Sequence, residues 1–273
     1  MYRFIILLLT LCSQQLFADS PKRVITLAPH IIENLYAINA ERDVVGTIKF
    51  SNYPEAAKSI PVVGDAFGLN IEKIISLKPD LVIAWRGGNK TKDIDKLINL
   101  GIKVIYSEPK TLEDLFNELA HYGELFDRQS NAQNVIASIK KDLSKLKALY
   151  NSKRAVPLFY QLWHKPLQTT GNDPWLNQLI DICGGINIFK SSNSGFPQVS
   201  IEQILAAQPE AIIVPTNQSN IVKYLTFWQQ WPAINAVKKS NILRVDADAL
   251  HRYTPRVING VRNLCLAIDK ARN

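Results

Sequence analysis

The sequence has few cysteines, three in 273 residues, and no apolar run long enough to cross a membrane. Its longest apolar stretch, residues 4–12, is far shorter than the roughly 20 residues that a spanning helix needs. Twelve glycines and fourteen prolines occur without a period, which excludes collagen-like and low-complexity chains. The hydrophobic fraction of 47% excludes wholesale disorder. A folded protein with a sizeable core is expected, with two domains or one repeated plan.

The common signatures of enzymes are also missing. The chain contains no G-x-G-x-x-G, P-loop, H-E-x-x-H, G-x-S-x-G or C-x-x-C motif. Its four histidines are far apart, and no two of them have the spacing of metal ligands. We therefore expect no catalytic residues, no metal and no cofactor. A secreted metal-dependent enzyme stays open as an alternative, because His30, His164 and His251 all lie near predicted strand or loop ends.

Basic residues are in excess but do not cluster. Lys and Arg number 32 against 24 Asp and Glu, a net charge of +8. The densest basic run, Lys140 to Lys147, has the spacing of a solvated helix face. A phosphate-binding footprint needs a clustered patch and a recognition motif, so no nucleic-acid partner is expected.

The N-terminus predicts export. Arg3 precedes the short apolar run, and a polar stretch ending at Ala18 follows it, which fits a secretory signal peptide over residues 1–18. We therefore expect a soluble periplasmic protein, cleaved near Ala18. Removal of the signal takes away Cys12 and leaves Cys183 and Cys265, an even pair in an oxidising compartment. A disulfide between them is predicted, and two buried free thiols are the alternative.

One segment of the chain is duplicated. Residues 70–85 (NIEKIISLKPDLVIAW) and 200–215 (SIEQILAAQPEAIIVP) share five identities at an offset of 130 residues. Each copy begins with a helix-capping Asn70 or Ser200 and ends in an unbroken apolar run that is typical of a buried parallel strand. Between them, apolar residues at helical spacing are expected to face a core. In the first copy these residues are Ile71, Ile74 and Ile75.

The remaining pattern predicts two α/β lobes. Further strands are expected at 23–27, 44–48, 103–106, 156–162 and 242–245, and a long amphipathic helix at about 130–150. We take the N-terminal lobe as residues 19–128, the bridging helix as 129–150 and the C-terminal lobe as 151–273. The fold class is α/β, with two Rossmann-like lobes joined by a single long helix.

Aromatic residues gather near the ends of the predicted strands, where α/β sheets bind ligands. Trp85 ends one strand, Phe50 follows another, and Trp163 follows the first strand of the second lobe. Phe67 and Phe196 stand just before the two copies of the duplicated helix. Core packing explains any one of these rings, but the whole set suits a large, flat, partly apolar ligand.

These residues resemble a known family, the substrate-binding proteins of ABC importers with the Fe/B12 periplasmic-binding fold, and most closely its cobalamin-binding members. The resemblance covers essentially the whole mature chain. Its most specific stretch is LKPDLVIAWRGGN at residues 77–89, supported by CGGINIFK at 183–190 and PQVS at 197–200. It implies a helical-backbone, two-lobed, monomeric protein that captures cobalamin (vitamin B12) or a related corrinoid in an interlobe cleft. It also implies no catalysis, little closure of the cleft, and delivery to an ABC permease and its ATPase at the inner membrane.

The family's ligand-binding positions match this chain in part. Phe50 and Phe196 stand where the family has a Tyr and a Trp, while Gln168 replaces an aromatic. These departures leave haem or a ferric siderophore open as the ligand. The ligand-binding residues implied by the resemblance and the aromatic pattern are Phe50, Phe67, Trp85, Phe196, Asp248 and Arg252.

Two glutamates at equivalent points of the duplication are candidates for docking. Glu72 and Glu202 are second in their helices and off the apolar stripe. In the family the matching glutamates dock onto the permease. Alternatively, each acid only favours its helix dipole, a contribution of about 0.3–1 kcal/mol.

Overall fold

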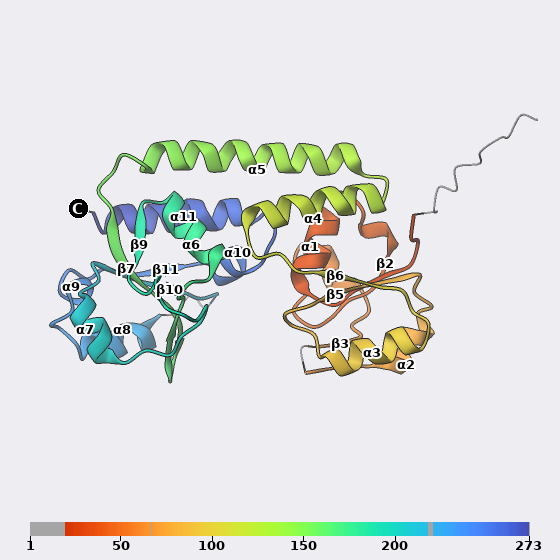
Figure 1. Ribbon diagram of the computed structural model, residues 1–273, viewed down its shortest axis with the longest axis horizontal. Coiled ribbons are helices and arrows are strands. Elements are labelled where there is room, and N and C mark those ends of the chain that lie inside the picture. The colour runs from red at the N-terminus through yellow and green to blue at the C-terminus, as the bar shows by residue number, and fades with distance from the viewer. Residues whose placement is uncertain (1–19, 66, 218–220, 273) are drawn as a thin grey trace, which may run out of the picture.

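The computed structural model describes residues 20–65, 67–217 and 221–272, and the chain has a mixed α/β fold with two lobes side by side (Figure 1). The predicted signal peptide, residues 1–18, lies outside the described residues. Helix α5 (Gln129–Tyr150) runs along one side of both lobes. Each lobe is built on a parallel sheet, as the sequence predicts.

The N-terminal lobe has a four-stranded parallel sheet in the order β2-β1-β5-β6. These strands are β1 (Val24–Thr26), β2 (Val44–Gly46), β5 (Leu81–Trp85) and β6 (Val104–Ser107). A small antiparallel pair joins β3 (Gly64–Asp65) to β4 (Gly68–Leu69). The helices are α1 (Pro29–Ala37), α2 (Ile71–Ser76), α3 (Thr91–Asn99) and α4 (Leu112–Leu125), with 3₁₀ turns at η1 (Glu41–Asp43) and η2 (Glu55–Ser59).

The C-terminal lobe has a five-stranded sheet with the path β11-β10-β7-β8, and β9 also pairs with β7. Only the β7–β8 pair is antiparallel. The strands are β7 (Val156–His164), β8 (Leu167–Thr169), β9 (Gly185–Asn187), β10 (Ala211–Pro215) and β11 (Ile242–Val245). The helices are α6 (Pro174–Ile182), α7 (Ile201–Ala207), α8 (Val222–Gln229), α9 (Asn235–Lys238), α10 (Ala247–His251) and α11 (Val257–Lys270).

The duplicated segments fold alike. The side chain of Asn70 accepts a hydrogen bond from the Lys73 amide at the start of α2, and Ser200 caps α7 in the same way. After each helix one residue takes a left-handed conformation, Lys78 at φ 46° and Gln208 at φ 45°, directly before a proline. The duplication therefore fixes the backbone path as well as the apolar pattern.

One detail of the predicted apolar stripe is wrong. Ile74 is fully buried and Ile71 packs against the core, but Ile75 is 46% exposed. A six-residue helix lying on a sheet buries only a narrow arc, and Ile75 falls outside it.

The hydrophobic core is continuous between the lobes on the α5 side. A single cluster of buried residues includes Leu115 of α4, Ile139 and Leu143 of α5, Leu179 of α6 and Leu264 of α11. Each sheet has a separate cluster on its other face. Within the described residues, no helix has both the length and the apolar content for crossing a bilayer. Because the lobes share packed side chains as well as a helix, we expect their relative motion to be small.

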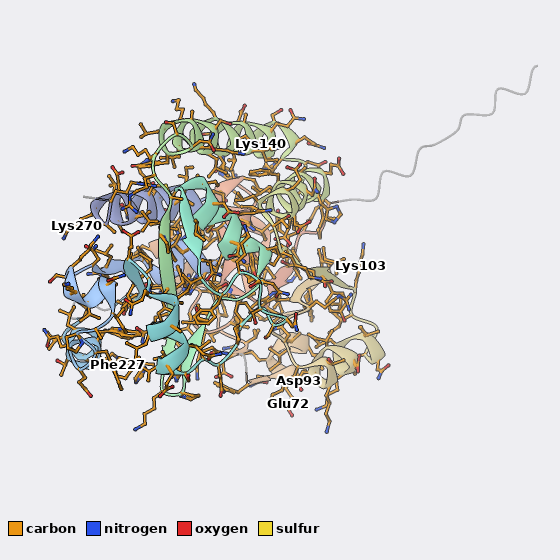
Figure 2. The ribbon with its side chains drawn as sticks, turned by 60° about the vertical axis from the view of Figure 1, so that its left-hand side comes forward. Glu72, Asp93, Lys103, Lys140, Phe227 and Lys270 are labelled. Atoms are coloured by element: carbon orange, nitrogen blue, oxygen red, sulfur yellow. A yellow bond between two sulfur atoms is a disulfide. The ribbon has the colours of Figure 1, made fainter. Side chains whose placement is uncertain are left out.

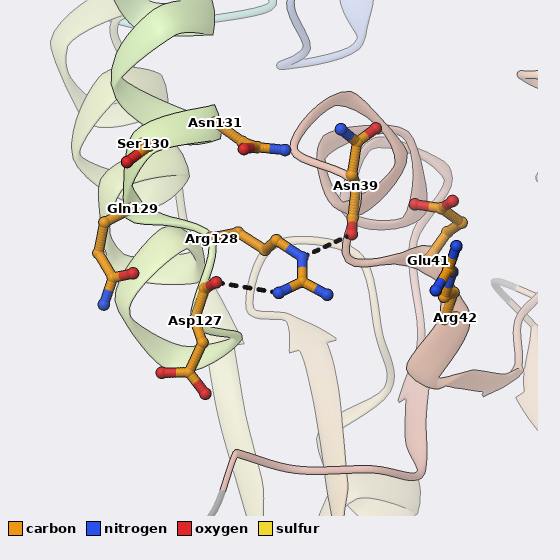
Figure 3. Close-up of a pocket in the computed structure, with 8 residues that line it drawn as sticks. All are labelled: Asn39, Glu41, Arg42, Asp127, Arg128, Gln129, Ser130 and Asn131. Atoms are coloured by element: carbon orange, nitrogen blue, oxygen red, sulfur yellow. Dashed lines mark hydrogen bonds between the residues drawn. The ribbon is translucent and has the colours of Figure 1, made fainter.

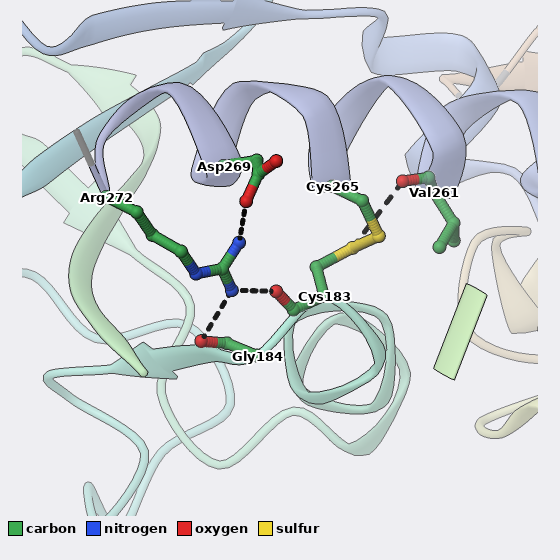
Figure 4. The surroundings of a disulfide bond; sticks show 6 residues. All are labelled: Cys183, Gly184, Val261, Cys265, Asp269 and Arg272. Atoms are coloured by element: carbon green, nitrogen blue, oxygen red, sulfur yellow. Dashed lines mark hydrogen bonds and ion pairs between the residues drawn. A yellow bond between two sulfur atoms is a disulfide. The ribbon is translucent and has the colours of Figure 1, made fainter. Parts of the chain in front are cut away.

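The predicted disulfide is confirmed. Cys183, at the end of α6, is bonded to Cys265 of α11 (Figure 4). The Arg272 guanidinium lies beside it, donating to the Cys183 carbonyl at 2.6 Å and pairing with Asp269 at 2.8 Å. The bridge and the arginine together fix the end of α11 to α6.

Candidate functional site

The candidate site lies where the strand ends of the two lobes meet. Arg252 and Tyr253 follow β11 and α10 of the C-terminal lobe, and both contact the N-terminal lobe. Arg252 reaches Glu33 of α1, and Tyr253 packs on His30, the second residue of the same helix. The segments that follow β1 and β11 therefore meet between the lobes.

Trp85 is held firmly at the end of β5. The Asn89 side chain accepts a hydrogen bond from the Trp85 amide at 2.7 Å and donates to the Leu27 carbonyl at 2.8 Å. The indole lies over its own turn so closely that a Cβ at Gly88 would be 1.9 Å from Trp85 Cε3. Glycine at this position is what allows the half-buried ring to lie flat on the turn.

A row of rings crosses from one lobe to the other. His30 packs edge-on against Trp85, with ring centroids 5.4 Å apart, and against Tyr253 at 5.7 Å. Tyr253 in turn meets Trp175 of α6 at 4.7 Å. Burial, with a smaller contribution from the nearby Arg252 charge, lowers the pKa of His30 to about 3. The imidazole is therefore neutral, and its Nε2 lies 2.8 Å from the Ser107 hydroxyl.

A buried carboxylate joins the lobes. Glu33 is only 1% exposed, and it pairs with Arg252 and with Arg256, whose Nε and Nη2 atoms lie 2.8 and 2.9 Å from its oxygens. Arg252 also binds the Asn52 side chain and pairs with Asp248, each at 2.9 Å. Its own side chain is 12% exposed. The structure thus brings Asp248 and Arg252 together, as an ion pair that is already part of an interlobe cluster.

Sequence reasoning missed Glu33, Arg256 and Tyr253. The available signal was the composition of α1, where Glu33 and Asn34 directly follow the apolar pair Ile31 and Ile32 and are buried with it. Two adjacent polar residues within a buried helix require partners. Asn34 finds one in the Tyr253 carbonyl, 3.0 Å from its amide nitrogen.

Three of the predicted rings are open to solvent. Phe67 is 82% exposed in the turn between β3 and β4, and Phe50 and Phe196 are also exposed. Phe50 has a left-handed backbone at φ 68°, an unusual conformation for a bulky residue. Within the described ranges, no ring contact joins these three to Trp85 or to each other. They are available to a ligand, and core packing does not explain them.

Two hollows lie apart from these rings. One of about 410 Å³ is lined by α1, the start of α11 and Tyr53, whose ring lies 4.0 Å beneath the Arg256 guanidinium. The other, about 580 Å³ and polar, lies where Arg128 links the α4–α5 turn to the Asn39 carbonyl (Figure 3). Neither is lined by a predicted ligand-binding residue.

The two candidate docking acids are exposed on the same side of the molecule. Helices α2 and α7, which carry Glu72 and Glu202, lie on the side away from α5 (Figure 1). Figure 2 shows Glu72 at the opposite edge from Lys140 of α5. Hydrogen bonding to the Ser200 side chain lowers the pKa of Glu202.

Metal-ligating residues do not gather in the described part of the chain, where no three His, Cys, Asp or Glu side chains form a candidate cluster. His251, directly before Arg252, has its Nε2 3.0 Å from the Tyr160 hydroxyl.

Comparison with known proteins places this geometry in a family. Residues 24–249 match the model of the family described as periplasmic binding protein. A vitamin B12-binding protein of Vibrio vulnificus is 36% identical over 259 residues, covering 94% of each chain. The crystal structure of the periplasmic vitamin B12-binding protein BtuF of Vibrio cholerae is 33% identical, with a TM-score of 0.82 over 93% of this chain and 99% of that one. The haem-binding protein RhuT of Roseiflexus has the same fold, with a TM-score of 0.82 at 21% identity over 92% and 99% of the chains. The chain therefore belongs to the periplasmic binding protein family.

Proposed function

We propose that this protein captures cobalamin, or a related corrinoid, between its two lobes and delivers it to an ABC importer. The proposal rests above all on the exposed aromatic rings near the strand ends, in a chain similar over nine-tenths of its length to proteins named for vitamin B12 binding.

The chemistry of the side chains suits a corrinoid. Phe50, Phe67 and Phe196 offer open apolar faces, and Trp85 offers one that is already held in place. Such rings bury about 150–250 Å² each and favour flat, apolar ligands. Asp248 supplies polar acceptors for the amide groups at the edge of a corrin, while Arg252 contributes whichever donors its interlobe partners leave free.

The ligand is tested by titrating the purified mature protein with cyanocobalamin and, in parallel, with haemin. Calorimetry should give one-to-one cyanocobalamin binding at nanomolar to low micromolar concentration. Trp85→Ala should weaken it at least tenfold, and Trp85→Phe should weaken it less, because a ring remains. Absence of cyanocobalamin binding in the wild type refutes the proposed ligand, and an unchanged affinity in Trp85→Ala removes Trp85 from the site.

Haem or a ferric siderophore is the second candidate. His251 lies directly beside Arg252 near the strand ends, and imidazole is a common ligand of haem iron. Tighter binding of haemin than of cyanocobalamin in the same titration favours this candidate over cobalamin.

Delivery requires a partner at the membrane, and we propose that Glu72 and Glu202 dock the monomeric protein, in the periplasm, onto the permease of an importer driven by an ATPase. Both carboxylates are exposed on one side of the molecule, one per lobe, so two symmetric permease subunits can each meet one. Surface charge pairs of this kind orient and steer a partner more than they add affinity.

Docking is tested by replacing both acids with alanine and measuring uptake into proteoliposomes that contain the permease and its ATPase. Uptake should fall to background while the ligand affinity stays within twofold of wild type. Glu55→Ala with Glu113→Ala, which also removes two exposed acids, serves as the control and should transport normally. Normal uptake by the Glu72 and Glu202 double variant refutes the docking role.

A further inference from the structure

The β7–β8 hairpin extends beyond the sheet to which it belongs. In the part of the chain that the structure describes, β10 pairs with β7 at Leu158–Tyr160, and the last part of β7, residues 161–164, pairs with β8. Across the hairpin Trp163 is directly opposite Gln168. Figure 1 shows β7 leaving the end of α5 and the hairpin projecting on the opposite side of the lobe.

Trp163 is both fixed and uncovered. Its indole nitrogen donates to the Lys165 carbonyl at 3.1 Å, and its ring lies 5.5 Å from that of His164. His164 packs edge-on against Tyr224 of α8, 6.1 Å away, which ties the hairpin to the body of the lobe. The Trp163 side chain is nevertheless 56% exposed. The contacts therefore orient the ring without burying it.

The second exposed ring, Phe196, lies in a loop beside β8. Gln168 forms a bridge with Gln198 on its other side, and its side-chain nitrogen donates to the Phe196 carbonyl at 3.0 Å. Gln168 of β8 therefore links the two rings, since it pairs with Trp163 across the hairpin and holds the Phe196 segment on its other side.

We propose that Trp163 is a further ligand-binding residue, which forms with Phe196 an aromatic surface on the C-terminal lobe that packs against the flat ring of the macrocyclic ligand. The inference rests on the proposed function, because it takes the ligand to be a flat macrocycle. A ring that is oriented in advance loses little freedom on binding, so its contact favours affinity. It also supplies an aromatic group directly across the hairpin from the polar Gln168.

The test measures the affinity of Trp163→Ala and Trp163→Phe for cyanocobalamin and for haemin by calorimetry. Leu149→Ala is the matched control, because Leu149 is 57% exposed and lies on α5, the side away from the hairpin. We expect at least a tenfold loss of affinity for Trp163→Ala, less than threefold for Trp163→Phe and none for Leu149→Ala.

The outcomes separate this inference from the proposed function. Wild-type binding of cyanocobalamin with an unchanged affinity in Trp163→Ala overturns the role of Trp163 and leaves the function standing. Binding of haemin only, with a tenfold loss in Trp163→Ala, supports Trp163 and overturns cobalamin as the ligand. Binding of neither macrocycle by the wild type overturns both.

A second measurement uses the unaltered protein, so it does not depend on the folding of a variant. Hydroxyl-radical oxidation, mapped by mass spectrometry, should fall at least threefold at Trp163 when the bound macrocycle is saturating. Leu149 should react equally in both states and serves to normalise the radical dose. Equal oxidation of Trp163 with and without bound ligand overturns the inference.

Discussion

Glu33→Ala is the substitution that should most disturb the contact between the lobes. The carboxylate is 1% exposed and is shared by Arg252 and Arg256, whose side chains are 12% and 19% exposed. Its removal leaves two largely buried guanidiniums without their common counter-charge. Breaking a buried ion pair from one side costs about 3–5 kcal/mol, because the remaining charge is desolvated and unpaired.

The structure places the cost of Glu33→Ala at the lower end of this range. Arg252 keeps Asp248 and Asn52 as partners, and Arg256 keeps its stacking on a tyrosine ring. We therefore expect the free energy of unfolding to fall by about 3 kcal/mol, which for a chain of this size lowers the melting temperature by about 6–12 °C.

Urea denaturation and calorimetric melting of the Glu33 variants provide the measurement. Glu55→Ala removes an acid from an exposed pair with Lys58 and should cost less than about 1 kcal/mol. Adding Arg256→Ala to Glu33→Ala should recover part of the loss, because it removes the unpaired charge. Equal costs for Glu33→Ala and Glu55→Ala, or additive effects in the double variant, refute the reasoning.

Two further predictions concern the surroundings of the site. Glu118 of α4 accepts a hydrogen bond from the side chain of Asn34 at 3.2 Å. Burial lowers the pKa of His30 from 6.5 to about 3 and raises that of Glu118 from 4.5 to about 7. Neutral His30 therefore stabilises the fold less as pH falls below 6.5, and protonated Glu118 stabilises it less as pH rises above 4.5, so their effects oppose each other between these values. The free energy of unfolding of each variant, measured by denaturation from pH 4.5 to 6.5, is compared with that of the wild type. Relative to the wild type, the stability of Glu118→Gln should rise with pH and that of His30→Gln should fall. If the stability of either variant changes with pH in the same way as that of the wild type, the pKa assignment is contradicted. Gly88→Ala should displace the Trp85 ring and weaken cyanocobalamin binding at least tenfold in calorimetry. Gly87→Ala should weaken it less, because a Cβ at Gly87 would be 3.5 Å from Trp85 Nε1, an ordinary contact distance. Equal affinities of the two variants for cyanocobalamin would count against the close packing of Trp85 on Gly88.

Local sequence patterns predicted most of the fold. The duplicated cap, helix and apolar run correspond to α2 with β5 and α7 with β10, because each pattern is satisfied within about sixteen residues. The 22-residue helix α5 was also predicted, since its apolar spacing persists over its whole length. The exposure of Ile75 was not, because the width of the buried arc depends on how the helix lies against its neighbours.

In the candidate site, too, local sequence patterns predicted some residues, whereas contacts between residues far apart in the chain were missed. The exposed rings were found because Phe50 follows a predicted strand and Phe67 and Phe196 precede the two duplicated helices, positions that the sequence itself reveals. The cluster around Glu33 was not, because its partners lie 219 and 223 residues further along the chain. Nothing near Glu33 in the sequence indicates which arginines complete it.

This division also bears on how Arg252 contributes to binding. A ligand group that reaches its guanidinium must share it with Glu33, Asp248 and Asn52, which already hold it at the contact between the lobes. Among the residues that the structure describes, no aromatic or cation–π contact holds the rings of Phe50, Phe67 and Phe196, so a ligand can cover them without displacing one. We therefore expect the rings to supply most of the affinity, and Arg252 to act chiefly by holding the lobes at a fixed separation. An inflexible pair of lobes with uncovered rings matches a bulky, rigid ligand better than a small one, because the site need not close around it.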